Sequence, residues 1–274
     1  MSRGGREMTI LTVILTHLGA DLVQRQLAYL RALAPDSRFV ICHGGRREDF
    51  LALPEGTGLF IEDPSLRGPH FDKSINDTLR AVCAAYVRDD PTIDLVYVIE
   101  YDHLVLRADF ESSLRALTER FEAGLFAKAA SPRNDTNWLH FLTVRDDEQL
   151  DAYIAEISRR EDVGTRWGCL GTGLLLRRDA LQAFCSLVDP PAYYVEMFLP
   201  TAIYHLGFEV IDIDAVSDLY AEVRWVPELG LEDVRSAKHA GRAFVHPFKA
   251  LDQLEAIDQV LGPGENSRTA ARSG

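Results

Sequence analysis

Residues 94–103 read DLVYVIEYDH, and this stretch decides the fold class. Its first six residues are almost wholly apolar, which is expected for a strand of a parallel sheet when both faces of that sheet are covered. Polar side chains follow without a gap: Glu100, Tyr101, Asp102 and His103. We therefore predict a buried parallel strand over residues 94–99 and a ligand-binding group directly after it.

Outward from this strand, short apolar runs alternate with amphipathic stretches of helical spacing. The runs predict further strands at Thr9–Thr16, 38–42 and 58–62, and helices at 21–33, with Asp21 as its cap, and 71–86. Such alternation implies right-handed βαβ crossovers and an open, Rossmann-like, mostly parallel sheet flanked by helices. Ligands bind such sheets beyond the carboxyl ends of the strands, which points to the polar residues after each predicted strand.

The second half of the chain is less regular. It predicts a strand at 125–130, a glycine-rich loop entering a strand at 167–177, a helix at 193–206 that ends at Gly207, and a strand at 208–213. No linker divides the chain. We expect one α/β domain over 9–261, with a nucleotide-binding half (9–102) and an acceptor and catalytic half (103–261), between a flexible N-terminus (1–8) and a disordered tail (262–274).

Composition excludes some partners. The sequence holds 29 basic and 42 acidic residues, and the net charge of −13 argues against nucleic acid, which needs a basic surface. The four cysteines are far apart and predict reduced thiols of a cytoplasmic protein. No stretch indicates a signal peptide or a transmembrane segment. A homo-oligomer remains open. An acidic enzyme can still bind a nucleoside diphosphate when a divalent cation lies between them.

Glu100 and Asp102 place two carboxylates close together at the end of a buried strand. Burial of their charge is costly unless something compensates it. A divalent cation such as Mg²⁺ or Mn²⁺ does so, because it prefers oxygen ligands and keeps open positions for diphosphate oxygens. The alternative is a solvated acidic turn. The pattern therefore makes these residues candidates for a metal site.

The Glu-Tyr-Asp sequence at 100–102 resembles the DxD motif of GT-A glycosyltransferases, with Glu in place of the first Asp. The resemblance continues along most of the chain. GTGLLLRR at 171–178 is similar to the glycine-containing strand behind the donor sugar. EMFLP at 196–200 is similar to the segment that supplies the base in inverting members, and VHPFK at 245–249 to the residues that close over metal and diphosphate.

The resemblance implies a GT-A fold and a metal-dependent, inverting transferase. It would move a sugar from a nucleotide-sugar, a UDP-sugar by default or a GDP-sugar, to a hydroxyl of a carbohydrate or other acceptor. Asp102 is the expected metal ligand, joined by His246, since a neutral imidazole suits Mn²⁺ better than Mg²⁺. The Glu for Asp exchange leaves Glu100 as a contact to the ribose or to the groups that hold the metal ligands. Lys249 is expected to face the diphosphate, where a cation stabilises the leaving group.

Other polar residues near the predicted strand ends are candidates for the nucleotide contacts: Thr16, His17, His43, Asp63 and Lys73. Ordinary loop polarity explains each of them as well. A polar and aromatic cluster could pack against sugar rings, and aromatic side chains also fill cores. Its members are Asn134, Asp135, Asn137, Trp138, His140, Trp167, Tyr193 and Tyr194.

Glu196 is the candidate catalytic residue. It precedes Pro200, which we expect in the first turn of a helix. The positive end of the helix dipole would then favour the ionised carboxylate, and an ionised carboxylate can take the proton of an attacking hydroxyl. The alternative is a Glu that only caps the helix, and Asp189 and Glu209 are the rival candidates for the base.

Two other functions stay open. A nucleotidyltransferase acting on sugar phosphates has a similar sheet and metal site, but its glycine-rich, arginine-containing loop is missing after the first strand, where residues 16–20 read THLGA. A non-catalytic relative that binds a sugar or a partner would keep the fold and lose turnover. Release of nucleotide from a nucleotide-sugar, from a nucleoside triphosphate or from neither separates these possibilities.

Overall fold

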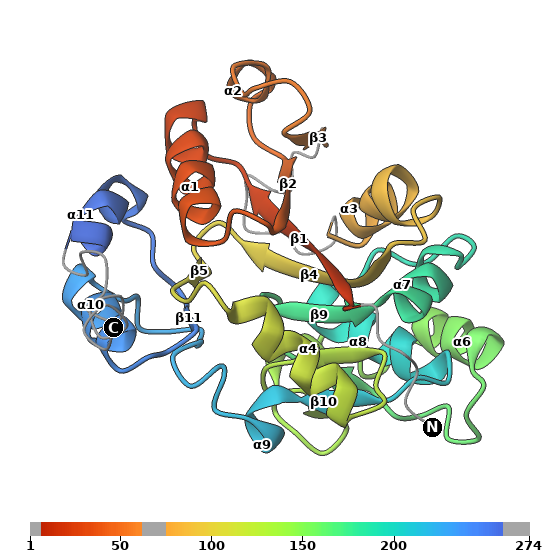
Figure 1. Cartoon of the computed structure of the whole chain (residues 1–274). Coiled ribbons are helices and arrows are strands. Elements are labelled where there is room, and N and C mark those ends of the chain that lie inside the picture. The colour runs from red at the N-terminus through yellow and green to blue at the C-terminus, as the bar shows by residue number, and fades with distance from the viewer. Residues whose placement is uncertain (1–6, 62–74, 260–274) are drawn as a thin grey trace.

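A seven-stranded sheet forms the centre of the computed structural model, which describes residues 7–61 and 75–259 (Figure 1). The strands lie in the order β10-β6-β9-β4-β1-β2-β3. Their bounds are β1 Thr9–Thr16, β2 Arg38–His43, β3 Gly58–Phe60, β4 Ile93–Glu100, β6 Leu125–Ala127, β9 Leu174–Arg177 and β10 Val210–Asp212. Among these strands β9 alone is antiparallel to its neighbours, β4 and β6. The predicted fold class, a mostly parallel central sheet flanked by helices, is confirmed.

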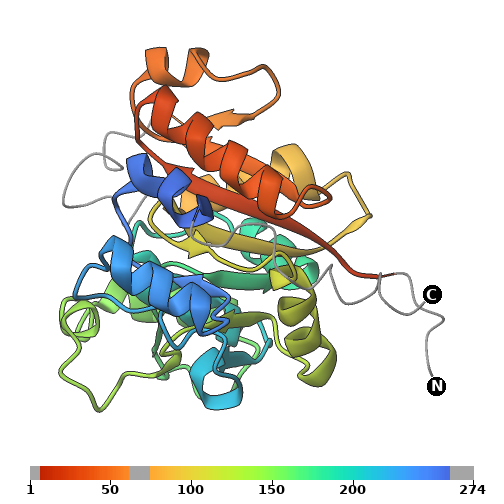
Figure 2. The same cartoon turned by 60° about the vertical axis from the view of Figure 1, so that its left-hand side comes forward.

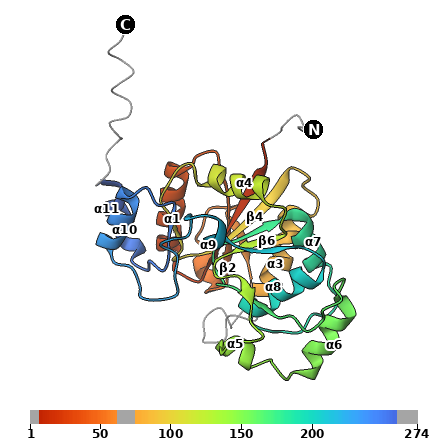
Figure 3. The same ribbon diagram turned by 90° about the horizontal axis from the view of Figure 1, so that it is seen from below.

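Helices cover both faces of this sheet (Figures 1 and 3). Those that pack on one face are α1 Ala20–Leu33, α4 Phe110–Arg120, α10 Leu231–His239 and α11 Leu254–Gln259. Those on the other face are α3 Ile75–Val82 with the π-helical turn η3 Cys83–Val87, α6 Glu148–Ile157, α7 Arg178–Cys185 and α8 Val195–His205. Short elements complete the described chain: α2 Arg47–Leu51, α5 Leu139–Leu142, α9 Ile213–Val216 and η4 Leu251–Gln253.

The alternation of side chains along β1 shows why the sheet needs both layers. Ile10 and Ile14 enter the core on one face, and Leu11, Val13 and Leu15 enter the core on the other. Successive side chains of a strand point to opposite faces, so a continuous apolar run requires cover on both sides. Each fully buried side chain of this size contributes about 1.5–3 kcal/mol.

Several predicted boundaries differ from the structure for local reasons. Helix α1 begins at Ala20 and has Gly19 as its N-cap, so Asp21 lies in the first turn and the prediction that it caps the helix is wrong. Strand β6 ends at Ala127, before Ala129 adopts a positive φ of 56°. Gly207 follows α8 with a φ of 95°, which confirms its predicted place after the helix.

The C-terminal part returns to the carboxyl end of β4. Two residues of β11, Phe244–Val245, pair antiparallel with β5, Leu104–Val105, which follows β4 directly. Helix α11 then lies beside α1, and α10 lies beside α11 (Figure 2). This return is what places residue 246 opposite residue 102. Within the described residues, no helix has the length and apolar character needed to cross a membrane.

Candidate functional site

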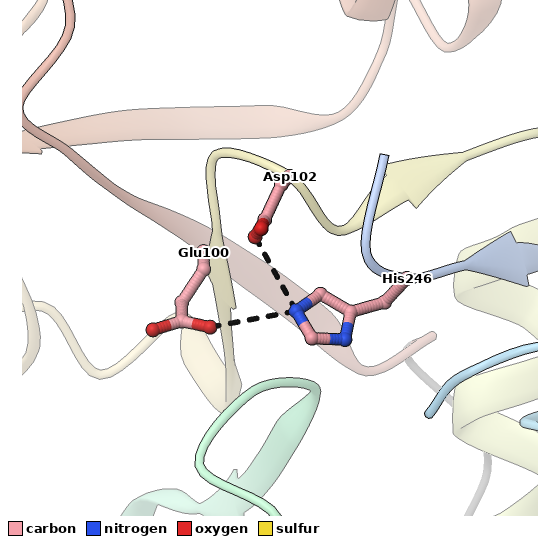
Figure 4. A group of neighbouring side chains, drawn as sticks. All are labelled: Glu100, Asp102 and His246. Carbon is pink, nitrogen blue, oxygen red and sulfur yellow. Dashed lines mark ion pairs between the residues drawn. The ribbon is translucent and has the colours of Figure 1, made fainter. Parts of the chain in front are cut away.

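Three side chains converge at the carboxyl end of β4: Glu100, Asp102 and His246 (Figure 4). Nε2 of His246 lies 3.3 Å from Oδ1 of Asp102 and 3.6 Å from Oε2 of Glu100. One potential ligand atom from each side chain lies within 4.8 Å of the other two. We call these three residues the triad. The structure therefore brings together the two predicted metal ligands and adds Glu100 beside them.

The backbone holds His246 in place from two sides. The N–H of Phe248 donates to the carbonyl of Asp102 at 2.8 Å, which extends the contact between β5 and β11. The imidazole Nδ1 donates to the carbonyl of Arg224 at 2.7 Å. Because a carbonyl can only accept, Nδ1 carries the proton of the neutral ring and the lone pair lies on Nε2, facing the carboxylates. An outer hydrogen bond of this kind fixes the tautomer of metal-binding histidines.

The triad places two carboxylates beside a single imidazole. Oδ1 of Asp102 is buried and has no hydrogen-bond partner among the described residues. Burial lowers the pKa of His246, but the two nearby carboxylates of Asp102, at 3.3 Å, and Glu100, at 3.6 Å, together outweigh burial and raise it to about 9. Two carboxylates at this position therefore attract positive charge strongly.

A divalent cation fits these residues. With metal–ligand bonds of about 2.1 Å, neighbouring ligand atoms of an octahedral site lie about 3.0 Å apart, so only small side-chain movements are needed. Oδ1 of Asp102 and Nε2 of His246 face each other, and a bound cation would take the place of the proton on Nε2. Two carboxylates and one imidazole form a donor set that suits Mn²⁺ better than Mg²⁺.

A buried polar network lies beneath the triad and was not predicted from the sequence. Oη of Tyr97 lies 2.9 Å from Nε2 of His103, and Oγ1 of Thr172 lies 3.3 Å from its Nδ1. Thr172 Oγ1 also accepts from the N–H of Glu100 at 3.1 Å. Tyr220 donates to the carbonyl of Gly173 at 2.6 Å. Burial lowers the pKa of His103 well below its ordinary value, so this ring supports the triad as a neutral group.

A cavity of about 320 Å³ opens beside the triad, and we call it the main cavity. Thr16, His17 and Lys249, three of the residues predicted to contact the nucleotide or its diphosphate, line it. Tyr101, which belongs to the predicted ligand-binding group after the strand, also lines it, and its ring makes an edge contact with His17, with ring centroids 5.1 Å apart. Lys249 is exposed at the rim, and its ammonium has no ion pair among the described side chains.

His43 lies elsewhere, below the loop that follows β1. Its ring is fully buried, with Nε2 2.9 Å from the carbonyl of Leu18 and Nδ1 accepting from the N–H of Gly45 at 3.2 Å. Both ring nitrogens thus serve the backbone, and the side chain supports the loop that carries His17. Asp63 and Lys73 lie outside the described residues.

Glu196 lies in the first turn of α8, next to the triad. Its Oε1 accepts from the N–H of Gly171 at 2.7 Å, and its Oε2 lies 3.7 Å from Nε2 of His140. The residue is 8% exposed, and burial raises the pKa of Glu196 to about 7 even though the Gly171 bond opposes the shift. Burial therefore opposes the ionised carboxylate that the position near the helix N-terminus was expected to favour.

Pro200 explains why the 169–171 loop meets Glu196. The predicted place of Pro200 in the first turn is wrong, because α8 begins at Val195 and Pro200 lies inside the helix. A proline has no N–H for the carbonyl four residues earlier, which is that of Glu196. The N–H of Cys169 donates to this carbonyl instead, at 2.9 Å. Both the backbone and the side chain of Glu196 therefore bind the loop.

The aromatic cluster divides into two groups. The ring of His140 stacks on Tyr194 with centroids 3.6 Å apart, and both lie beside Glu196. Trp138 packs on Gly168, where a Cβ would lie 2.3 Å from the indole, and so anchors α5. By contrast, Trp167 packs against Tyr204, and Tyr193 donates to Asp147.

Trp225 was not among the candidates from the sequence. It is 62% exposed and lines the main cavity. A large exposed aromatic side chain in a loop carries no periodic signal, so only the folded chain shows its place beside the triad.

Among known proteins, no family model and no curated protein matches the chain. Three solved structures are loosely similar to it. An active-site mutant of LgtC is 12% identical, covers 94% of this chain and 98% of its own, and has a TM-score of 0.41. The galactosyltransferase LgtC with donor and acceptor sugar analogues is 16% identical, covers 73% and 72%, and has a TM-score of 0.38. A Pyrobaculum calidifontis mannosyltransferase with GDP-Man and Mn²⁺ is 15% identical, covers 74% of this chain and 54% of its own, and has a TM-score of 0.39. These likenesses are loose, and the proposals below rest on the geometry of the site.

Proposed function

We propose that this protein is a metal-dependent glycosyltransferase that moves a sugar from a nucleoside diphosphate sugar to an acceptor hydroxyl with inversion. One observation carries the proposal. The triad, with its orphaned carboxylate oxygen, lies at the carboxyl end of the central strand and borders a cavity on one side and the Glu196 carboxyl on the other. The triad can therefore bind an anion through a cation, and the adjacent Glu196 can accept a proton.

The main cavity supports the donor part of the proposal. Glu100, Asp102 and His246 would hold Mn²⁺, with Glu100 as a third ligand and not a ribose contact. When bound, the cation would neutralise diphosphate oxygens and stabilise the leaving group. Lys249 at the rim adds a positive charge on the same side. Thr16, His17 and Tyr101 remain for the nucleoside, with UDP as the default and GDP as the alternative.

Glu196 supports the acceptor part. Its Oε1 is held by the Gly171 amide, so the carboxyl has a fixed orientation, and Oε2, 3.7 Å from Nε2 of His140, would face the acceptor. A carboxylate at this place takes the proton of the attacking hydroxyl while the hydroxyl oxygen bonds to the anomeric carbon. A single displacement of this kind inverts the anomeric centre.

The metal claim is tested by Asp102→Asn. For the wild type, calorimetric titration of UDP and GDP should show tight binding with Mn²⁺ and weak binding with EDTA. For Asp102→Asn we expect equally weak binding in both, because the substitution removes a charged ligand and leaves the shape. Asp146→Asn is the matched control, since its side chain is 84% exposed and far from the triad in the chain. Equal affinities of the wild type with Mn²⁺ and with EDTA would contradict the proposal.

Turnover is tested by nucleotide release. The wild type is incubated with Mn²⁺ and UDP-glucose, UDP-galactose or GDP-mannose, and separately with nucleoside triphosphates and sugar phosphates. We expect release of UDP or GDP from a nucleotide-sugar. Pyrophosphate from the second set would identify a nucleotidyltransferase, and no release from either set would identify a binding protein. Both results contradict a glycosyltransferase.

A further inference from the structure

The site has a second, smaller cavity next to the main one. Gly171, Tyr194 and Glu196 line the smaller cavity and not the main one. Asp102 and Lys249 line the main cavity and not the smaller one. Glu100, Ile75, Trp225 and His246 line both, so they mark the junction. A transfer between two substrates has to occur where their spaces meet, which is this junction.

The two cavities differ greatly in volume. The main cavity measures about 320 Å³, whereas the smaller one measures about 20 Å³. A cavity of about 10–15 Å³ is enough for one water molecule, so the smaller cavity accommodates a single oxygen and not a sugar ring. A hydroxyl that enters it meets the Glu196 carboxyl, while the rest of its molecule has to stay outside.

The residues around the smaller cavity indicate which kind of acceptor can lie outside it while its hydroxyl lies inside. On one side the rings of Tyr194 and His140 form a stacked pair, with an angle of 15° between their planes. At the junction Trp225 leaves more than half of its surface exposed. Flat aromatic surfaces of this kind favour a ring with an apolar face, as a pyranose presents. Glu100 and Glu196 add acidic groups, which disfavour an anionic acceptor.

We propose, on the basis of the function proposed above, that the smaller cavity seats the reacting hydroxyl of the acceptor and that Trp225 holds the acceptor ring. The acceptor class is then an uncharged glycoside. In the transfer, the O–H bond of the acceptor breaks and its proton passes to Glu196. The acceptor oxygen bonds to the anomeric carbon, and the bond from that carbon to the diphosphate oxygen breaks, with its electron pair leaving on the diphosphate.

A water molecule also fits the smaller cavity. Without an acceptor, a water molecule next to Glu196 should attack the donor slowly, and the protein should release nucleotide from the donor alone. This gives a readout of the donor side that does not depend on Trp225 holding a ring.

The test compares transfer with hydrolysis in Trp225→Ala and Trp225→Phe. The donor is whichever of UDP-glucose, UDP-galactose and GDP-mannose the wild type consumes with Mn²⁺. The acceptors are p-nitrophenyl glucoside, galactoside and mannoside, with the anionic glucuronide as a fourth. For Trp225→Ala we expect the acceptor KM to rise on the order of tenfold, while donor hydrolysis falls much less. Trp225→Phe should recover most of the loss.

Leu51→Ala is the control, because Leu51 is 69% exposed on α2 and lines neither cavity. It should change neither transfer nor hydrolysis. Equal losses of hydrolysis and transfer in Trp225→Ala would overturn the inference, because Trp225 would then serve the donor. Donor hydrolysis without transfer to any neutral glycoside, or equal use of the glucuronide, would also overturn it and leave the proposed function standing. A wild type that consumes no donor would instead refute the proposed function itself.

Discussion

The donor side and the acceptor side of the site are built in different ways. The donor side, Thr16, His17, Tyr101, Asp102 and Lys249, follows the ends of β1, β4 and β11. The acceptor side, His140, Gly171, Tyr194, Glu196 and Trp225, comes from loops, one short helix and the first turn of α8. The comparison teaches that strands of the sheet position the groups for the cation and the diphosphate. Contacts between loops position the groups that would meet the acceptor.

The two sides also differ in their charge. On the donor side a buried carboxylate oxygen of Asp102 has no hydrogen-bond partner in the described chain, and the site attracts a cation. On the acceptor side burial raises the pKa of Glu196 to about 7, so its charge is disfavoured and its affinity for a proton is increased. A base needs affinity for a proton, and a metal ligand needs negative charge. The same type of side chain therefore suits two roles in two surroundings.

We expect the largest effect from Glu196→Gln, which changes the acceptor side and should reduce turnover. Removal of a general base typically lowers kcat by about a hundred- to ten-thousand-fold. The glutamine oxygen can still accept from the Gly171 amide, so the loop and the donor affinity should be retained. The measurement is kcat of the variant with the best donor, together with the anomeric configuration of the wild-type product by NMR.

Glu209→Gln is the matched control, because its carboxylate is 59% exposed and pairs with Arg160 away from both cavities. It should keep normal turnover. Near-normal kcat in Glu196→Gln, or retention at the anomeric carbon, would show that Glu196 has another role.

The donor side could be predicted from the sequence to a large extent. Strand β1 coincides with its predicted range, and β4 extends the predicted range by one residue at each end. A polar residue that directly follows a buried strand has to lie at the edge of the sheet, so a predicted strand also predicts the position of that residue. His246 is more remote, and the resemblance of its motif predicted its place while the pairing of β11 with β5 creates it.

The acceptor side could be predicted only in part. Glu196 was a candidate from its motif, but the Gly171 bond and the proximity of His140 depend on tertiary contacts. His43 shows the reverse case, because its position after β2 indicated a nucleotide contact and its ring supports the backbone instead. Hydrogen bonds between residues far apart in the chain leave no local pattern in the sequence.

A second expected effect concerns stability against pH in the metal-free protein. The folded-state pKa of Glu196 is about 7, above its ordinary value of 4.5, so folding favours the protonated form. Its contribution to stability is fully present below pH 4.5 and is lost as the pH rises through about 7. The loss amounts to at most about 3 kcal/mol. Urea unfolding with EDTA between pH 5 and 8 should show a steeper decline for the wild type than for Glu196→Gln. Parallel curves would mean that the carboxyl of Glu196 is more solvated than the structure shows.

The smallest expected effect is that of a substitution at Gly173, on the donor side. Its φ is 71°, and an added Cβ would lie 2.9 Å from the rings of His103 and Tyr220, which are both buried beneath the triad. Gly56 has a similar φ of 76°, with nothing within 4 Å of an added Cβ, so Gly56→Ala isolates the backbone strain alone. Overpacking of a well-packed core typically costs about 1–3 kcal/mol, so Gly173→Ala should lower the free energy of unfolding by that amount beyond Gly56→Ala.

Displaced rings would also disturb Thr172, whose hydroxyl holds the Glu100 amide, so Gly173→Ala should weaken Mn²⁺ binding and Gly56→Ala should not. Urea unfolding and Mn²⁺ titration of the two variants provide the measurements. If the two substitutions cost the same, the rings beneath the triad are free to move, and the donor side is no more rigid than the loops opposite it.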